Sequence, residues 1–160
     1  MERDGARFAA EFPAAGPAAT EALGAAIAGG LRPGDAVALE GDLGAGKTTL
    51  ARAILRALGV DEAVPSPSFT LVQHYETARL PVWHYDLYRV AHADEMRELG
   101  LDEALADGAV LIEWPERAPA FVPEDALHVR IAVTGEAQRR IHLSGPARWR
   151  EMLRLEEQHG

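Results

Sequence analysis

The sequence of 160 residues predicts an α/β fold, in which a mixed, mainly parallel sheet is flanked by helices and carries a C-terminal antiparallel hairpin. Short apolar runs alternate along the chain with stretches of helical periodicity, a pattern typical of parallel strands joined by helices. A glycine-rich loop connects one of these runs directly to a helix. No repeat, low-complexity tract or linker interrupts the pattern, so we expect residues 1–160 to form a single domain.

The first third of the chain predicts two strands and two helices in alternation. Residues 7–12 are predicted to form a short edge strand. Residues 17–29 have apolar side chains four apart on one face and end in a glycine pair, which indicates a helix. Residues 35–40 (DAVALE) form an apolar run typical of a buried strand, and residues 47–58 have helical periodicity.

The middle of the chain predicts a loop, a hairpin and an interrupted helix. Residues 64–69 (VPSPSF) contain two prolines and two serines, which favours a loop. Residues 70–75 and 81–86 then predict two strands joined by a short turn. Helical periodicity returns at residues 94–105 and is expected to break near Gly100.

The C-terminal third predicts one more buried strand and the antiparallel hairpin. Residues 109–113 (AVLIE) form a short apolar run that ends in a carboxylate. Residues 127–133 and 139–143 alternate apolar and polar side chains on either side of a turn. Residues 146–157 are predicted to form a helix that caps the domain.

The composition excludes several classes of function. The formal charge is −9, and a surface of that sign disfavours independent binding of nucleic acid. The chain has no cysteine, which excludes disulfides, thiolate catalysis and cysteine-ligated metal sites. No segment has the length or apolarity of a signal peptide or a transmembrane helix, so we expect a cytoplasmic protein without membrane contact. Among the 16 basic residues Lys47 is the only lysine, which favours a chemical role for it.

The glycine-rich segment fits the phosphate-binding loop called the P-loop or Walker A motif. Residues 41–48 (GDLGAGKT) match G-x-x-x-x-G-K-[ST] and lie between a predicted strand and a predicted helix, as that motif requires. Glycines let backbone N–H groups surround an anion at the positive end of the helix dipole. We therefore expect a P-loop NTPase-like fold, with Lys47 on the β- and γ-phosphates and Thr48 on Mg²⁺. The expected nucleotide-binding residues here are Asp42, Gly44, Ala45, Gly46, Lys47, Thr48 and Thr49.

Adenine is the base expected by elimination. P-loop GTPases usually recognise guanine through an Asn-Lys-x-Asp motif. The chain has no asparagine and no second lysine, so it cannot contain that motif. The sequence therefore predicts ATP as the nucleotide and Mg²⁺ as its metal.

Two carboxylates are candidates for the metal and the attacking water. Asp86 (VWHYD) and Glu113 (AVLIE) each follow apolar residues at the expected C-terminal end of a strand, where α/β sheets bind ligands. Thr48, Asp86 and Glu113 are thus the expected metal ligands, and Lys47, Asp86 and Glu113 the expected catalytic residues. The alternative for each carboxylate is a helix N-cap or a solvated strand end.

Five sequence blocks together resemble the TsaE family of bacterial ATPases, formerly called YjeE. The blocks are Thr20 with Gly24, GDLGAGKTTL, SPSFTLV followed by Tyr75, HYDLYR at residues 84–89, and EWPE at residues 113–116. Their order and spacing agree with the family over roughly residues 17–117, and the similarity fades after about Pro123. Ser68 stands where the family more often has threonine, which keeps the hydroxyl.

This resemblance implies a P-loop ATPase that is slow or silent alone. The family acts in tRNA threonylcarbamoyladenosine biosynthesis with a TsaD–TsaB partner pair, which transfers a threonylcarbamoyl group to adenosine 37 of tRNA. tRNA would then contact this chain only indirectly. The resemblance also implies that Asp86 is the Mg²⁺ carboxylate, that Glu113 is needed for hydrolysis, and that the SPSF loop, with Ser66 and Ser68, senses the nucleotide.

Some residues and functions keep two interpretations. Trp114 could stack on adenine or pack against a neighbouring helix. His84 lies on the same strand face as Asp86 but has no second histidine at ligand spacing, which disfavours a metal role. A basic cluster near the C-terminus either forms a solvated face or contacts tRNA or an acidic partner. It consists of the arginines at positions 139, 140, 148, 150 and 154. A solvated face is favoured, because glutamates are interleaved with these arginines.

Two other functions compete with a partner-activated ATPase. One is a small-molecule kinase. Such an enzyme closes an arginine-bearing lid over its acceptor, but Arg97 is the only basic residue in the region where the lid would lie, residues 93–108, and the charged residues there are otherwise acidic. The other is a nucleotide-gated binding module without useful turnover.

Overall fold

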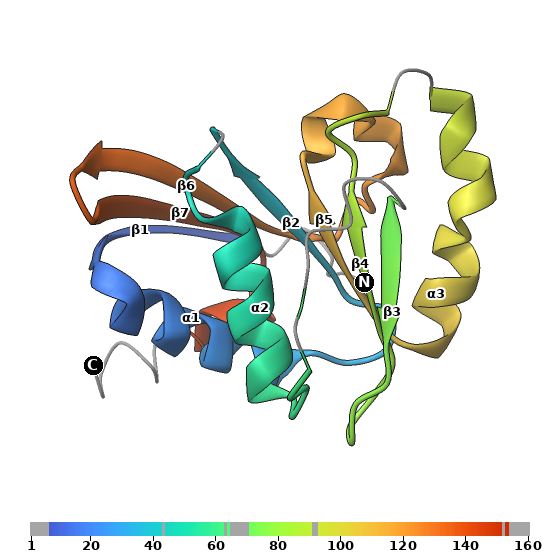
Figure 1. The fold of residues 1–160 in the computed structure, drawn as a ribbon, viewed down its shortest axis with the longest axis horizontal. Coiled ribbons are helices and arrows are strands. Elements are labelled where there is room, and N and C mark those ends of the chain that lie inside the picture. The colour runs from blue at the N-terminus through green and yellow to red at the C-terminus, as the bar shows by residue number, and fades with distance from the viewer. Residues whose placement is uncertain are drawn as a thin grey trace.

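The computed structural model of the chain describes residues 7–42, 44–62, 64, 71–90, 93–151 and 153, with the side chains at positions 93, 94 and 97 excepted. It contains a seven-stranded sheet in the order β1-β7-β6-β2-β5-β4-β3 (Figure 1). The central pairs β6-β2, β2-β5 and β5-β4 are parallel, and the outer pairs are antiparallel. The strands are β1 (Arg7–Ala15), β2 (Ala36–Gly41), β3 (Val72–Tyr75), β4 (Val82–Asp86), β5 (Ala109–Glu113), β6 (Leu127–Gly135) and β7 (Gln138–Pro146). The predicted mixed α/β sheet with its C-terminal hairpin is confirmed.

In the described part of the chain, three α-helices and three short 3₁₀ segments connect the strands. They are α1 (Gly16–Gly30), α2 (Lys47–Ala57), α3 (Leu101–Asp107), η1 (Ala93–Leu99), η2 (Pro115–Arg117) and η3 (Pro119–Phe121). The predicted break at Gly100 is confirmed: this glycine has a φ of 68° and separates η1 from α3. Of the predicted C-terminal helix, residues 148–151 and 153 are helical, and its remaining end lies outside the described residues.

Apolar clusters lie on both faces of the sheet. Neighbouring residues of β5 point to opposite faces, so Leu111 joins the cluster under α1 and α2, while Val110 and Ile112 join the cluster under η1 and α3. Figure 1 shows α1 and α2 side by side on one part of the sheet and α3 beside the opposite edge. No helix among the described residues is long and apolar enough to cross a membrane.

The helix that follows the glycine-rich loop is held by a close contact with α1. A Cβ atom at Gly24 would lie 2.6 Å from the Cβ atom of Ala53 on α2, a distance that side chains do not tolerate. The missing side chain at position 24 therefore lets the two helices approach closely, and this contact fixes the place of α2 over the central strands.

The second apolar cluster contains a tyrosine that should make the fold sensitive to alkali. Tyr85 is fully buried and its hydroxyl donates a hydrogen bond to the carbonyl of Leu99 at 2.8 Å. Burial, with a smaller contribution from Glu103, raises the pKa of Tyr85 to about 12.

The stabilising effect of the Tyr85 proton is complete below pH 10, because both states are then protonated. It is lost between pH 10 and 12, where only the unfolded state ionises, and the loss amounts to about 2 to 3 kcal/mol. Tyr85→Phe should cost about 1 kcal/mol at neutral pH and flatten this alkaline loss. Urea unfolding of both proteins from pH 7 to 11.5 measures the effect, and parallel curves would contradict it. Tyr75, whose pKa is raised mainly by burial, should contribute to the remaining slope in the same direction.

Candidate nucleotide-binding site

The glycine-rich loop connects β2 to α2 in a conformation that only glycine accommodates well. Gly46 has a φ of 118° and directly precedes the first turn of α2. A Cβ atom at Gly41 would lie 2.7 Å from the carbonyl oxygen of Ile131 on β6. The loop is closed on itself by a hydrogen bond from the N–H of Ala45 to the carbonyl of Asp42 at 3.0 Å. The strand, loop and helix expected from the motif are therefore present in that order.

Lys47 is buried inside this loop, with 5% of its surface exposed. Its Nζ donates hydrogen bonds to the carbonyls of Gly41 and Asp42, the latter at 2.9 Å. The Nζ also lies 4.1 Å from the ring centroid of Trp114, a cation–π contact. Burial lowers the pKa of Lys47, and nearby carboxylates, of which Glu113 acts most strongly, oppose that change. The ammonium group is therefore held at the loop with little water around it.

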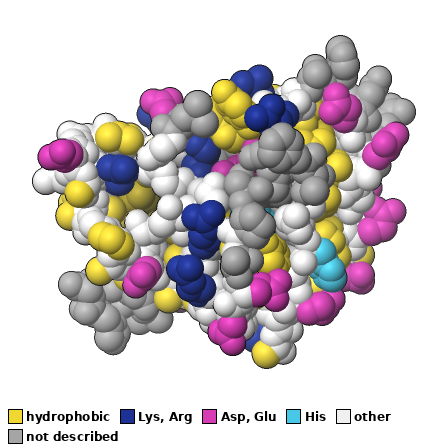
Figure 2. Space-filling model, in the orientation of Figure 1, with side chains coloured by type: hydrophobic (Ala, Val, Ile, Leu, Met, Phe, Trp, Pro, Cys, Tyr) yellow, Lys and Arg dark blue, Asp and Glu magenta, His cyan; other side chains and the backbone are white. Residues whose placement is uncertain are grey.

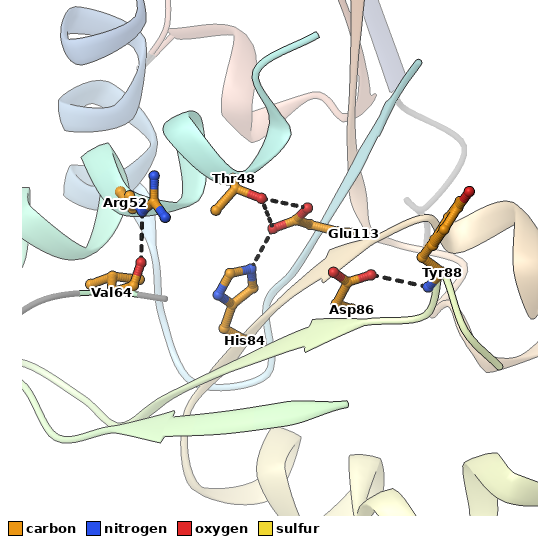
Figure 3. Close-up of polar contacts among 7 residues, drawn as sticks. All are labelled: Thr48, Arg52, Val64, His84, Asp86, Tyr88 and Glu113. Atoms are coloured by element: carbon orange, nitrogen blue, oxygen red, sulfur yellow. Dashed lines mark hydrogen bonds and ion pairs between the residues drawn. The ribbon is translucent and has the colours of Figure 1, made fainter. Parts of the chain in front are cut away.

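Glu113 is the carboxylate that contacts the loop threonine. The Thr48 hydroxyl lies 2.9 and 3.0 Å from the two carboxylate oxygens of Glu113. His84 Nε2 lies 2.7 Å from Oε2 of the same group, and Figure 3 shows both side chains converging on Glu113. His84 is 0% exposed and Glu113 2%. The half-buried Thr48 of α2 and the buried His84 of β4 and Glu113 of β5 thus form one polar cluster.

His84 was not expected to take part in this cluster. It contacts Glu113 because β4 and β5 are parallel neighbours in which Asp86 lies opposite Glu113, so that His84 reaches the same sheet edge from two residues earlier. Its Nδ1 is buried without a hydrogen-bond partner in the described part of the chain. The sequence signal was the alternation of His84 with Asp86 on one strand face, but the pairing of β4 with β5 was needed to interpret it.

Asp86 lies beside this cluster, at the end of the neighbouring strand. It is 4% exposed, and its Oδ1 accepts a hydrogen bond from the N–H of Tyr88 at 3.0 Å. Both carboxylates are therefore buried, so the alternative that they are solvated strand ends is wrong. The resemblance implies that Asp86 binds the metal ion. In the structure, however, the hydroxyl of Thr48, itself an expected metal ligand, contacts Glu113 (Figure 3).

Trp114 lies on the same side of the loop as Lys47. It has a φ of 60°, and its ring is 4.8 Å from that of Tyr88 and packs at the edge of the second apolar cluster. The indole thus packs structurally, between Lys47 and Tyr88. Its stacking on adenine stays a prediction.

A separate pocket of about 300 Å³ borders the loop and is lined by the start of α1, the start of α2 and the β6-β7 hairpin. Thr20, Thr49 and Arg139 line it with polar side chains, and most other lining residues are apolar or glycine. Arg139 Nε donates a hydrogen bond to the carbonyl of Ala45 at 2.9 Å. Trp114 is not among the described residues that line this pocket. The hairpin therefore forms one wall of the site, which sequence spacing alone did not indicate.

The predicted solvated arginine face holds for Arg140 and is wrong for Arg139 and Arg148, which are half-buried. Besides Arg139, Arg140 pairs with Glu11 on β1, and Arg148 pairs with Asp35 and lies over the ring of Trp149. Arg139 and Arg148 thus contact other parts of the fold, Arg140 and Arg150 are exposed, and Arg154 lies outside the described residues.

The proline and serine loop begins next to the site. Arg52 on α2 donates a hydrogen bond from Nε to the carbonyl of Val64 at 2.6 Å (Figure 3). Ser66 and Ser68, the predicted nucleotide-sensing residues, lie outside the described residues.

Comparisons with known proteins agree with the motifs of the site. The family model described as "Threonylcarbamoyl adenosine biosynthesis protein TsaE" matches residues 14–141. The tRNA threonylcarbamoyladenosine biosynthesis protein TsaE of Bacillus subtilis is 38% identical over 138 residues, covering 86% of each chain. Its counterpart in Streptomyces coelicolor is 43% identical over 112 residues, covering 68% of this chain and 76% of that one.

A solved structure supports the same relationship. The crystal structure of Bacillus subtilis YdiB matches with a TM-score of 0.78 and 30% identity, covering 96% of this chain and 97% of that chain. The family match includes the loop, His84, Asp86, Glu113 and most of the C-terminal hairpin. The chain therefore belongs to the TsaE family, whose members are tRNA threonylcarbamoyladenosine biosynthesis proteins.

Proposed function

We propose that the chain is a Mg²⁺-dependent ATPase that supports the threonylcarbamoyladenosine modification of tRNA together with a TsaD–TsaB partner pair. The observation that carries this proposal is the contact of the half-buried Thr48 with the buried Glu113, beside the buried Lys47. A hydroxyl and a carboxylate at this place are the oxygen ligands that Mg²⁺ prefers. Lys47 would lie on the phosphates, and the loop N–H groups would surround them.

Glu113 and Asp86 would have different roles at the metal ion. Because Thr48 and Glu113 are in direct contact, one metal ion can reach both, so we assign Glu113 to Mg²⁺ as well as to hydrolysis. Asp86, opposite Glu113 on the neighbouring strand, would hold a water in the metal's outer shell or the attacking water. This assignment exchanges part of the roles that the resemblance implied.

The pocket next to the loop would hold the base. Its described lining contains no aspartate or glutamate, the acceptor that guanine's N1–H and amino group require. Apolar walls with two threonines and Arg139 suit adenine, which offers one amino group and ring-nitrogen acceptors. This lining supports ATP over GTP.

A partner would be needed for efficient turnover. In the described state, Lys47 donates to loop carbonyls and Thr48 to Glu113, so the groups that would bind Mg²⁺-ATP are engaged with one another. ATP binding would require an arrangement in which these contacts are broken. A partner that favours this second arrangement over the first would raise turnover. A small-molecule kinase is less well supported, because the acidic segment of residues 93–108 repels a phosphate-bearing acceptor.

Phosphate release under four conditions tests the proposal: the chain alone, with tRNA, with the purified TsaD–TsaB pair, and with both. We expect slow release alone, no stimulation by tRNA alone because of the charge of −9, and at least tenfold stimulation by the protein pair. Full activity in isolation would indicate a self-sufficient ATPase or kinase. ATP binding without release in any condition would indicate a nucleotide-gated binding module.

A further inference from the structure

A groove of about 780 Å³ lies between η1 and α3 on one side and η2 and η3 on the other. Its floor is apolar, and the floor side chains are Met96, Leu101, Leu105, Phe121 and Val122. All but Met96 are only partly buried and pack against the edge of the second apolar cluster. Apolar side chains left open along a groove are typical of a surface that another molecule covers.

The rim of this groove is negatively charged. Asp102 and Glu103 line it from the first turn of α3, both are exposed, and neither has an ion-pair partner among the described residues. Residues 93–107 contain six acidic residues and one arginine. Figure 2 shows acidic side chains along the edge of the molecule where α3 lies. This field attracts a cationic occupant and repels nucleic acid and anionic membranes.

A row of cation–π and ring contacts connects the groove to the phosphate loop. Arg117 lines the groove, and its guanidinium carbon lies 5.0 Å from the ring centroid of Tyr88. The Tyr88 ring is 4.8 Å from that of Trp114, which in turn lies 4.1 Å from Lys47 Nζ. The link is also covalent, because η2 begins two residues after Glu113. A molecule that moves Arg117 therefore acts on a continuous row of contacts that ends at Lys47.

We propose that this groove is the docking site for a basic amphipathic segment of a partner protein, and that the row of Arg117, Tyr88, Trp114 and Lys47 couples docking to the phosphate loop. The segment would place apolar residues on the floor and Lys or Arg opposite Asp102 and Glu103, as an amphipathic helix does in an apolar groove. The proposal rests on the proposed function in so far as the TsaD–TsaB pair supplies that segment.

Two matched charge reversals test the site. Asp102→Lys with Glu103→Lys changes the rim, and Asp61→Lys with Glu62→Lys makes the same charge change at an exposed acidic pair after α2. We expect the rim variant to bind the immobilised TsaD–TsaB pair at least tenfold more weakly, because like charges would face each other, and the control to bind like the unchanged protein. A synthetic amphipathic helix of leucine and lysine should likewise bind the rim variant more weakly than the control variant, as measured by fluorescence anisotropy of the labelled peptide.

Arg117→Gln tests the coupling separately. We expect this variant to bind the pair within about threefold of the unchanged chain, because it keeps the apolar floor and both acidic rim residues, but to lose most of the stimulation of ATP hydrolysis. Normal stimulation of Arg117→Gln would overturn the coupling.

Each remaining outcome separates this proposal from the proposed function. If the rim variant binds the pair and is stimulated like its control, the groove is not the docking site, while the ATPase proposal stands. If the unchanged chain neither binds the pair nor is stimulated by it, the proposed partner is wrong. The peptide then tests the groove by itself: equal binding of the peptide to both charge variants would overturn the groove as a docking site. If, without the peptide, tRNA or anionic vesicles bind the unchanged chain and the rim variant changes that binding more than the control variant does, a protein occupant is overturned.

Discussion

Glu113→Gln should lower the rate of ATP hydrolysis by about 10²- to 10⁴-fold, the range expected when a positioned carboxylate is lost from the reacting centre. Glutamine has nearly the same shape and can still meet Thr48 and His84, so the fold should persist. The lost negative charge would remove both the proposed metal ligand and a group able to polarise water. Single-turnover phosphate release with the partner pair present measures the rate, and the exposed Glu124→Gln is the matched control.

The Mg²⁺ requirement distinguishes Glu113 from Asp86. Because Thr48 touches Glu113, Glu113→Gln should raise the Mg²⁺ concentration needed for ATP binding more than Asp86→Asn does. The opposite order would restore Asp86 as the main metal carboxylate. Normal hydrolysis by both variants would mean that this polar cluster serves the fold alone.

Lys47→Ala should abolish the rise in melting temperature that ATP produces. At ATP near 100 times Kd, binding stabilises a protein by about 2.7 kcal/mol. A domain of this size gains about 2 to 4 °C per kcal/mol, so the unchanged protein should melt about 5 to 10 °C higher with Mg²⁺-ATP. The alanine variant loses the cation on the phosphates, and differential scanning fluorimetry over an ATP titration measures the difference.

Lys47→Arg and GTP are the controls for this result. Arginine keeps the charge, but a planar guanidinium does not fit where the Nζ meets the carbonyls of Gly41 and Asp42, so this variant should also fail. An unchanged rise in melting temperature with ATP in Lys47→Ala would mean that the loop only caps α2 and does not bind the phosphates. An equal shift with GTP in the unchanged protein would contradict the assignment of the pocket beside Thr49 to adenine.

Local patterns predicted most of the fold. The apolar run at residues 109–113 coincides with β5, and the loop, α2 and the C-terminal hairpin lie where periodicity and glycine placement indicated. The hairpin strands extend several residues further than predicted, because β7 gains a second partner in β1. Sheet pairing adds hydrogen bonds that residue periodicity does not encode.

The site was predictable only where residues share a strand end or a loop. Asp86, Glu113, Lys47 and Thr48 were expected to meet because parallel strands end at one sheet edge. Arg139 was not, since its contact with Ala45 joins segments 94 positions apart and depends on where the hairpin packs. The place of Trp114 depends on its left-handed backbone, which is uncommon for a bulky residue and has no marker in the sequence.

The position of β1 has a consequence for the newly synthesised chain. This strand is at the sheet edge and pairs only with β7, from Arg7 opposite Pro146 to Ala15 opposite Gln138. Translation at about 5 to 20 residues per second completes that partner roughly 7 to 25 s after β1 itself is made. Until then the backbone of β1 has no strand beside it, and Phe8, buried in the finished molecule, lacks its sheet environment. The first strand to leave the ribosome is therefore the last to join the sheet, and nascent chains halted before residue 138 should expose an adhesive edge that a chaperone must shield.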